Sequence, residues 1–339
     1  MTYEELFTFE NLYNSHLKAR LCKRYKKEVI EFELNTGSNI MKLFNELKYQ
    51  KYKISSYKTF YISDPKERRV DALSYRDRIV QHCLCDYYLT PLFERKLIFD
   101  NAATRPNKGT DFARGRLKHF YNDFYNKHHS NLGYILKCDI YHYFESIDHS
   151  VLKEILKKDV LDHKILHLLY TIIDSFNIDL GKGLPIGNQT SQAFAIRYLD
   201  ELDRVIKEKF RIKYYIRYMD DFILIDESKE KLIQVLKYIN DITLPKYKLT
   251  LNRKTKLCKL SFPCEFLGFR YHMKESGKIL MIIDGKRRHR FLKKINNKRV
   301  MLVKKQISLN KFLETQNSYI EHISKRNKYY YLKKIKEII

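Results

Sequence analysis

Residues 216–225 decide the fold of this chain and read Ile-Arg-Tyr-Met-Asp-Asp-Phe-Ile-Leu-Ile. The aromatic and β-branched residues on both sides predict two strands, and the Met-Asp-Asp centre predicts the tight turn that joins them. Two adjacent carboxylates at such a turn repel each other, and divalent cations between them remove the repulsion. The stretch therefore indicates either an exposed acidic turn or a metal site, and a metal site needs a further acid nearby.

A further acid of this kind ends the apolar run 134–139. An Asp at a strand end is commonly a turn former or a helix N-cap. If this strand lies beside the hairpin, however, Asp139, Asp220 and Asp221 converge at one edge of a sheet. Three carboxylates can hold two Mg²⁺ ions, which stabilise the attacking and the leaving oxygen of a phosphoryl transfer.

The charge balance indicates a partner with many negative charges. The chain has 339 residues with 66 Lys and Arg against 40 Asp and Glu, a net charge of +26. So large an excess is typical of proteins that bind nucleic acid. No apolar run approaches the roughly 20 residues that a membrane span needs, and the N-terminus lacks the apolar core of a signal peptide. We therefore expect a soluble, cytoplasmic protein that binds no membrane.

The first 60 residues predict basic helices followed by a stretch rich in Lys and Tyr. Residues 48–53 and 57–61 interleave cations with aromatic rings, a mixture that suits RNA because cations meet phosphates and rings stack on bases. A solvated helix face with core aromatic residues explains the same pattern. The six cysteines lack the spacing of a zinc site and predict buried free thiols: Cys22, Cys83, Cys85, Cys138, Cys258 and Cys264.

The remaining pattern predicts alternating helices and strands without a linker or an internal repeat. We expect helices around 76–81, after His149, over 162–174, over 188–210 and over 229–242, with strands over 266–272 and 278–283. From Lys286 onward the pattern is helical and basic, including Lys325-Arg326-Asn327. The chain is therefore expected to form one compact catalytic unit with a helical C-terminal part.

Several motifs, taken in order, resemble those of reverse transcriptases. The palm motifs of that family are matched by Asp139…Phe144, Gly187…Ser191 and Tyr218-Met219-Asp220-Asp221. The finger motifs before them and the two motifs after them are matched by Arg69…Gln81, Arg105-Pro106-Asn107-Lys108, residues 251–256 and residues 266–269. Each motif alone is weak, but the ordered set over about residues 60–272 is highly specific.

The resemblance implies an α+β right-hand polymerase with an antiparallel sheet in the palm. An N-terminal basic helical extension would occupy 1–60, and the fingers would occupy 61–132 with part of 150–180. The palm would comprise 133–149 and 181–275, and a helical thumb would comprise 276–339.

The resemblance also implies the roles of the catalytic residues. Asp139 and Asp220 would be the principal ligands of two Mg²⁺ ions, for which Mn²⁺ can substitute. Asp221 and the carbonyl of Ile140 would support them. Lys254 would lie near the leaving pyrophosphate as a proton donor; a solvated cation is the alternative for this residue.

Further roles concern the nucleotide and the primer. Arg105 and Lys108 would hold the triphosphate, and Phe144 would stack under the sugar and exclude a 2′-hydroxyl, unless it is a core residue. The other implied nucleotide contacts are Ile186, Gly187 and Gln189. The implied primer grip is Phe266, Leu267, Gly268 and Phe269.

Ile186 carries the subfamily signal. Most reverse transcriptases have Gln at this position, whose amide contacts the nascent base pair, and Pro where this chain has Gln192. Replacing the amide by an apolar group removes a contact worth about 1 kcal/mol, so base selectivity is expected to weaken several-fold. The form resembles enzymes of diversity-generating retroelements, which copy a template RNA with errors at adenines.

The leading hypothesis is therefore an RNA-directed DNA polymerase that copies a cognate structured RNA into cDNA within a diversity-generating retroelement. Its partners would be the template RNA, the RNA–DNA hybrid, deoxynucleoside triphosphates (dNTPs) and a small accessory protein. One alternative is an antiphage defence reverse transcriptase that makes cDNA from a non-coding RNA. Another is a non-catalytic RNA-binding or splicing cofactor. The palm motifs do not separate these hypotheses, because partner choice resides in other parts of the chain.

Overall fold

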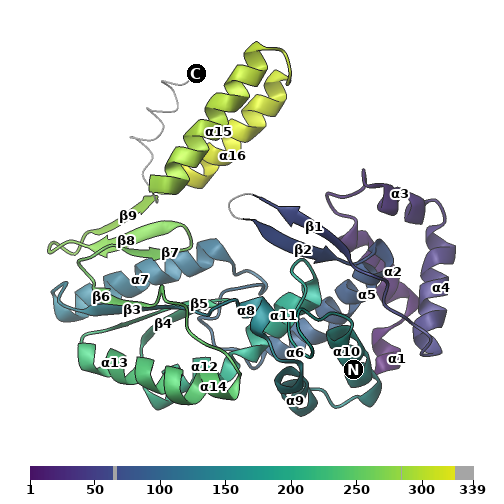
Figure 1. Ribbon diagram of the computed structural model, residues 1–339, viewed down its shortest axis with the longest axis horizontal. Coiled ribbons are helices and arrows are strands. Elements are labelled where there is room, and N and C mark those ends of the chain that lie inside the picture. Colours follow the sequence, from purple (N-terminus) through teal and green to yellow (C-terminus); the bar gives the residue numbers. More distant parts are fainter. Residues whose placement is uncertain (64–66, 284, 325–339) are drawn as a thin grey trace. The chain divides into compact units, whose positions relative to one another are not determined.

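The structure is a computed structural model that describes residues 1–63, 67–283 and 285–324. The chain divides into two compact units. Figure 1 shows the chain coloured by residue number. The first unit comprises 1–113, 138–224 and 230–255, and the second comprises 114–137, 225–229 and 256 onward. The predicted basic residues Lys325-Arg326-Asn327 and the side chains of 286–288 lie outside the described part.

The first unit begins with helices, as the sequence predicts. They are α1 (Tyr3–Leu6), α2 (Phe9–Ala19), α3 (Lys27–Glu33) and α4 (Thr36–Lys48). The hydroxyls of Thr2 and Thr8 accept backbone hydrogen bonds at the N-termini of α1 and α2, which satisfies donors that the helices leave unpaired. Helix α4 buries Ile40, Leu43 and Leu47 at helical spacing, so only one face is available to solvent.

A β-hairpin and a helix follow. Strand β1 (Lys58–Ile62) pairs antiparallel with β2 (Arg68–Ala72), and α5 (Tyr75–Leu84) continues through a π-helical turn (Cys85–Leu89) into α6 (Thr90–Glu94). The backbone N–H of Asp71 in β2 donates to the carbonyl of Ile186 at 3.3 Å. The loop that carries Ile186 and Gly187 is thereby joined to the hairpin.

Further helices of the first unit lie in the middle of the sequence. They are α8 (Tyr143–Ser146), α9 (His149–Asp159), α10 (His163–Asp174), α11 (Gln189–Tyr198), α12 (Asp200–Arg204) with a π-helical turn (Val205–Lys209), α13 (Lys229–Tyr238) with a π-helical turn (Ile239–Thr243), and α14 (Leu244–Lys246). The prediction of one helix over 188–210 is wrong. Leu199 leaves the helical region with φ −100° and ψ 15°, and the carboxylate of Asp200 then accepts hydrogen bonds from Arg197 and Arg204 across the break.

The predicted acidic hairpin is present. Strands β4 (Tyr214–Tyr218) and β5 (Asp221–Asp226) belong to a four-stranded sheet of order β4-β5-β3-β6, with β3 (Tyr134–Asp139) and β6 (Lys256–Lys259). Four consecutive residues of β4 and four of β5 are buried, so these strands are covered on both faces. Strand β3 has the bounds that the sequence predicts, and it pairs antiparallel with β6 from Tyr134↔Lys259 to Lys137↔Lys256.

The second unit contains α7 (Thr110–His128) and a three-stranded antiparallel sheet of β7 (Cys264–Phe266), β8 (Phe269–Met273) and β9 (Ile279–Ile283). The predicted single strand over 266–272 is wrong. Leu267 and Gly268 have φ values of +47° and +84°, and they form a two-residue turn between β7 and β8. Positive φ at both central positions matches the right-handed twist of a hairpin, and glycine adopts it at the lowest cost.

Two helices complete the described part of the second unit, α15 (Gly285–Val303) and α16 (Leu309–Ser324). They lie side by side in Figure 1, and the rings of Phe291 and Tyr319 contact each other with centroids 4.5 Å apart. Both helices fall in the region predicted to be helical from Lys286 onward.

Two further predictions concern the membrane and the cysteines. Within the described residues, no helix combines the length and the apolar character that crossing a membrane requires. Four cysteines are buried and Cys258 is half-buried, but Cys22 is exposed. The prediction of a buried thiol is therefore wrong for Cys22, which lies in a turn with φ +58°.

Candidate active site

The turn of the acidic hairpin lies against the end of β3. Met219 has φ +57°, and this backbone conformation lets the chain reverse between β4 and β5. The N–H of Ile140, the residue after β3, donates to the carbonyl of Asp220 at 3.3 Å. The carbonyl of Asp139 accepts the N–H of Asn252 at 2.7 Å. These backbone bonds hold Asp139 beside the turn that carries Asp220.

The two carboxylates interact directly. Burial and the neighbouring carboxyl of Asp139 raise the pKa of Asp220 to about 6, because each charge disfavours the other in a partly dehydrated position. The guanidinium of Arg68, in β2, acts in the opposite direction on the same carboxyl. Sequence reasoning singled out Arg69 and missed Arg68; the Arg-Arg pair in a strand was the signal that either residue could face the acids.

The sequence predicts that three carboxylates converge, but the structure does not group Asp221 with the other two. Asp221 is the first residue of β5, and successive residues of a strand point to opposite faces. Within the ranges that the structure describes, no three His, Cys, Asp or Glu side chains form a group suited to a metal ion. Asp139 and Asp220 are therefore the acids that the structure brings together, and Asp221 as a supporting ligand stays a prediction.

A paired set of part-buried carboxylates fits a divalent cation. Burial and, to a smaller extent, repulsion from Asp139 raise the pKa of Asp220, and a divalent cation bound to both carboxylates would replace that repulsion by attraction. Carboxylate oxygens are the ligands that Mg²⁺ prefers in phosphate-transferring sites. The donor set of Asp139 and Asp220 therefore suits Mg²⁺, and also Mn²⁺.

A buried ion pair stabilises the backbone of the turn. Arg217 in β4 donates from Nε and Nη2 to the two carboxylate oxygens of Asp203, both at 2.7 Å, and both side chains are fully buried. Its Nη1 donates to the carbonyl of Met219 at 3.1 Å, and Tyr215 donates its hydroxyl to Asp203 at 2.6 Å. Arg217 thus fixes the backbone immediately before Asp220. Sequence reasoning treated Arg217 as part of a strand and assigned it no role.

The predicted nucleotide contacts Phe144, Ile186 and Gly187 belong to one local structure. Phe144 lies in α8, half-buried rather than in the core, and its carbonyl accepts the N–H of Leu184 at 2.8 Å. Gly187 has φ +112°, and a Cβ there would approach a methyl of Val70 to 3.0 Å. Glycine is required here because the loop both turns through positive φ and touches β2.

Arg105 is paired with groups that lie close to it in the sequence. Its side chain is buried, and Nε and Nη2 donate to the carboxylate of Glu94 at 2.7 and 2.6 Å. Its Nη1 donates to the carbonyls of Ile98 and Asn101 at 2.5 and 2.9 Å. The guanidinium is thus held by a bidentate carboxylate and two carbonyls, the geometry that suits its planar fork. These contacts stabilise the segment around Arg105, and Arg105 as a triphosphate contact stays a prediction.

Lys108 is held by two aromatic rings of the same region. Its Nζ lies 4.5 Å from the ring centroid of Phe99 and 5.2 Å from that of Phe112, and it donates to the carbonyl of Phe99 at 2.6 Å. Lys108 as a triphosphate contact stays a prediction.

Gln189, at the start of α11, is oriented by a carboxylate. Its Nε2 donates to Asp86 at 2.8 Å, and Asp86 also accepts from Lys18 at 3.1 Å. Gln189 lines a cavity of about 200 Å³ together with Arg105 and Gln192. Burial would raise the pKa of Asp86, but the neighbouring His82 and the hydrogen bonds from Gln189 and Lys18 outweigh it and lower that pKa to about 2.

Replacing Asp86 by asparagine is expected to lower the free energy of unfolding by about 2 kcal/mol at pH 7. The pKa of Asp86 is depressed, so its contribution is present above the unfolded pKa of 3.8 and is lost as pH falls toward about 2. Urea unfolding of both proteins between pH 7 and pH 2 measures this. The difference between them should shrink below about pH 4; a difference that stays constant across the range would contradict the linkage.

Lys254 and the predicted primer grip lie in different units. Lys254 is exposed, and its backbone N–H donates to the side chain of Asn252 at 3.1 Å. In the second unit, Phe266 and Phe269 are buried while Leu267 and Gly268 form the turn. Arg114 donates to the carbonyl of Leu267 at 2.7 Å and lies 4.8 Å from the ring centroid of Phe269. Sequence reasoning missed Arg114, because its partner is 153 residues away.

Comparison with known proteins identifies the family. Residues 58–271 match the family described as reverse transcriptase (RNA-dependent DNA polymerase). The match covers more than half of the chain and includes both paired carboxylates. The chain belongs to the reverse transcriptase family. Domains of this family use divalent metal ions, generally Mg²⁺, in agreement with the donor set formed by Asp139 and Asp220.

Three relatives illustrate the similarity. Telomerase from Candida albicans, solved with the TWJ fragment of telomeric RNA, has a TM-score of 0.50 at 14% identity and covers 69% of this chain and 48% of its own. Apo telomerase from Candida tropicalis, truncated from its C-terminal domain, has a TM-score of 0.48 at 18% identity, with 70% and 58% covered. Protein YkfC from Escherichia coli (strain K12) is 23% identical over 154 residues, 44% of this chain and 39% of YkfC.

The chain thus spans 39% to 58% of the length of these relatives. The likeness to the Candida albicans structure, at 14% identity, concerns the fold alone. Together with the family match and the antiparallel sheets, it confirms the predicted α+β right-hand polymerase fold. This reverse transcriptase has the polymerase architecture, and its activity and partners are inferred below from the residues of the site.

Proposed function

We propose that this protein is an RNA-directed DNA polymerase that adds deoxynucleotides by two-metal nucleotidyl transfer. The observation that carries the proposal is the pair of Asp139 and Asp220, held together at the turn of the acidic hairpin inside the matched region. A structural role alone would not favour two adjacent carboxylates without a cation between them.

The residues of the site divide the work of such a reaction. Asp139 and Asp220 would hold the ions, with Asp221 and the carbonyl of Ile140 as further ligands. Bound Mg²⁺ supplies charge stabilisation for the transferring phosphoryl group. The charge of Arg68 acts on the carboxyl of Asp220, which supports Arg68 as a further triphosphate contact beside Arg105 and Lys108.

Other residues would align the nucleotide and the primer. Half-buried Phe144 offers a ring to the sugar, and exposed Lys254 is free to approach the leaving pyrophosphate. The resemblance to the family's motifs supports Phe266–Phe269, with the turn at Leu267 and Gly268, as the primer grip. Positioning of reacting groups contributes as much to such reactions as acid–base chemistry does.

The partners follow from charge and from the relatives. The net charge of +26 favours a polyanion, and one similar structure is a telomerase in complex with a telomeric RNA fragment. We propose that the substrates here are a structured template RNA, the RNA–DNA hybrid and dNTPs, with a small accessory protein as a further partner.

Ile186 favours the error-prone enzyme of a diversity-generating retroelement. The Ile186 carbonyl accepts the N–H of Asp71, so the backbone of this position is fixed and the side chain alone varies. Replacing Ile186 by glutamine is therefore expected to lower misincorporation opposite template adenines several-fold, because one hydrogen bond of about 1 kcal/mol is restored. Sequencing the cDNA that both proteins make from a defined RNA with Mg²⁺ measures this change.

The same experiment decides between the biological roles. Errors of the wild type concentrated opposite adenines support the diversifying enzyme. Accurate or repetitive cDNA supports an antiphage defence enzyme that copies a non-coding RNA. Failure of any Mg²⁺-dependent extension, with RNA binding intact and with the cell's own RNA and proteins added back, would overturn the polymerase and favour a non-catalytic RNA-binding cofactor.

A further inference from the structure

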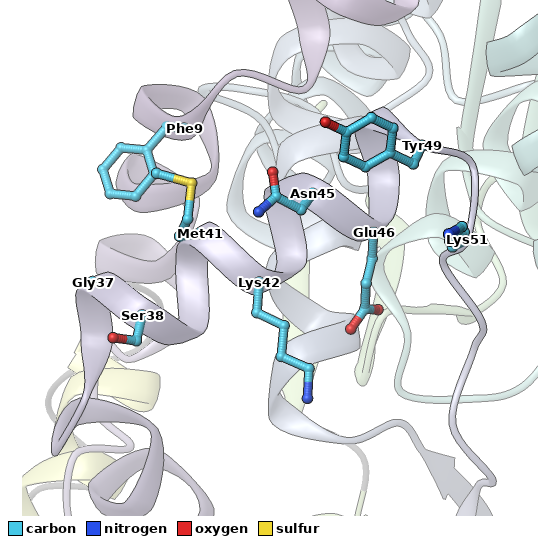
Figure 2. A pocket seen from close by; sticks show the side chains of 9 residues that line it. All are labelled: Phe9, Gly37, Ser38, Met41, Lys42, Asn45, Glu46, Tyr49 and Lys51. Atoms are coloured by element: carbon cyan, nitrogen blue, oxygen red, sulfur yellow. The ribbon is translucent and has the colours of Figure 1, made fainter.

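A large open groove lies on the solvent side of the N-terminal helices, within the first unit. Its volume is about 790 Å³. It is lined by Phe9, Gly37, Ser38, Met41, Lys42, Asn45, Glu46, Tyr49 and Lys51. Figure 2 shows that most of these residues follow α4, with Phe9 of α2 closing one end next to Met41. None of them contributes to the proposed active site.

Aromatic and apolar side chains form the floor of this groove. Gly37, Met41, Asn45 and Tyr49 recur every four residues and therefore lie in one row along α4. Phe9, Met41 and Tyr49 are 38%, 46% and 63% exposed, so their apolar surfaces are accessible to a ligand. In Figure 2 the amide of Asn45 lies between Phe9 and Tyr49. The row thus offers flat apolar surfaces with one hydrogen-bonding group among them.

The charges around the groove are positive. Lys42 and Lys51 line it, and Lys48 contacts the rings of Phe44 and Tyr49 at 5.7 and 5.9 Å. In the described part of the chain, none of these three lysines is paired with a carboxylate. The one acid of the groove, Glu46, is already bound by the guanidinium of Arg76 in α5. The groove therefore has a net positive charge.

We propose that this groove binds a single-stranded segment of RNA, with bases stacked on Tyr49 and Phe9 and phosphates near Lys42 and Lys51. Alternating cations and aromatic faces are the chemistry by which proteins hold single strands, since every base has a face that stacks and every nucleotide carries a phosphate. The side chain of Asn45 can hydrogen-bond to a base edge. The inference rests on the proposed function, because it adds a second RNA contact to a polymerase that copies RNA.

RNA fits this groove better than a protein helix does. A helix docking on Phe9, Met41 and Tyr49 would need a continuous apolar strip, but Asn45 interrupts the row. A partner that matches the lysines must also be negatively charged along its length. Single-stranded RNA meets both conditions, and the groove would hold a part of the RNA other than the templating nucleotides.

The test uses the full chain and a single-stranded RNA that contains 4-thiouridine. Photo-crosslinks are expected on the peptide that carries Tyr49. Tyr49→Ala should lose these crosslinks and bind the RNA about tenfold more weakly, while Tyr49→Phe keeps the ring and should bind as the wild type does. Lys42→Ala with Lys51→Ala should reduce the slope of log affinity against log salt by about 1.4, or about 0.7 for each phosphate that the protein no longer neutralises.

A matched control removes the same charge elsewhere. Lys157 and Lys158 are exposed on α9, and their double alanine variant should leave crosslinks unchanged. Extension of a short primer–template too short to reach the groove should be equal in all variants. If groove variants keep the wild-type affinity and crosslinks, the inference is overturned. If the wild type crosslinks but extends no primer, the polymerase proposal fails and the groove assignment stands.

Discussion

Asp220→Asn is expected to reduce nucleotide addition by about three orders of magnitude or more, which corresponds to at least about 4 kcal/mol of transition-state stabilisation. Asp220 pairs with Asp139 at the turn of the hairpin, and the amide removes one of the two charges that would hold the ions. The fold should survive, because the amide has nearly the same shape and no longer repels Asp139. Primer extension with saturating Mg²⁺ measures the loss.

Two controls separate catalysis from binding. RNA affinity should be unchanged or slightly higher, because the variant is less negative. Asp179→Asn removes the same charge from an exposed residue in a loop after α10 and should retain full activity. Substantial primer extension by Asp220→Asn, with Mg²⁺ or Mn²⁺, would contradict the assignment of Asp220 as a metal ligand.

Arg217→Met is expected to cost about 3–5 kcal/mol of stability, because it leaves the carboxylate of Asp203 buried without its counter-charge. Both side chains are fully buried, and the cost of burying them is offset by the two hydrogen bonds between them and by the bonds to Met219, Ile196 and Tyr215. Urea unfolding measures the effect. Arg204→Met, which removes an exposed arginine of α12, should cost less than about 1 kcal/mol.

The double variant Arg217→Met with Asp203→Leu distinguishes stability from positioning. Replacing a buried ion pair by apolar residues is often neutral, so the double variant should be more stable than Arg217→Met alone. Its primer extension should nevertheless remain well below that of the wild type, because the donor that fixes the carbonyl of Met219, and with it the turn before Asp220, is absent. Full recovery of activity together with stability would show that Arg217 has only a structural role.

The local elements were predictable because they are encoded by short-range patterns. The β-branched and aromatic residues around Asp220 predict the hairpin, and the apolar run before Asp139 predicts β3 with its observed bounds. The helices after His149 and from 162 to 174 follow from helical periodicity. The order of the motifs was enough to indicate the reverse transcriptase family, since the order of residues along a chain is itself sequence information.

Positive φ values and helix breaks were less predictable. The interruption at Leu199 contains no helix-breaking residue, and Asp200 accepts hydrogen bonds from Arg197 and Arg204 on either side of it. The turn at Leu267 and Gly268 contains a leucine, which intrinsic preference disfavours in the left-handed region. At Leu267 the turn also receives a long-range hydrogen bond from Arg114, which no local pattern encodes.

The sequence by itself determined the strands of the acidic hairpin and β3, several helices and the basic character of the chain. Only the tertiary structure decided which charged side chains pair with one another. Arg105 is turned onto Glu94, Arg68 acts on Asp220, and Arg217 is buried with Asp203. The physical reason is that the effect of a charged side chain depends on the group that folding places next to it. These partners lie at other positions along the chain, so a local sequence pattern does not identify them.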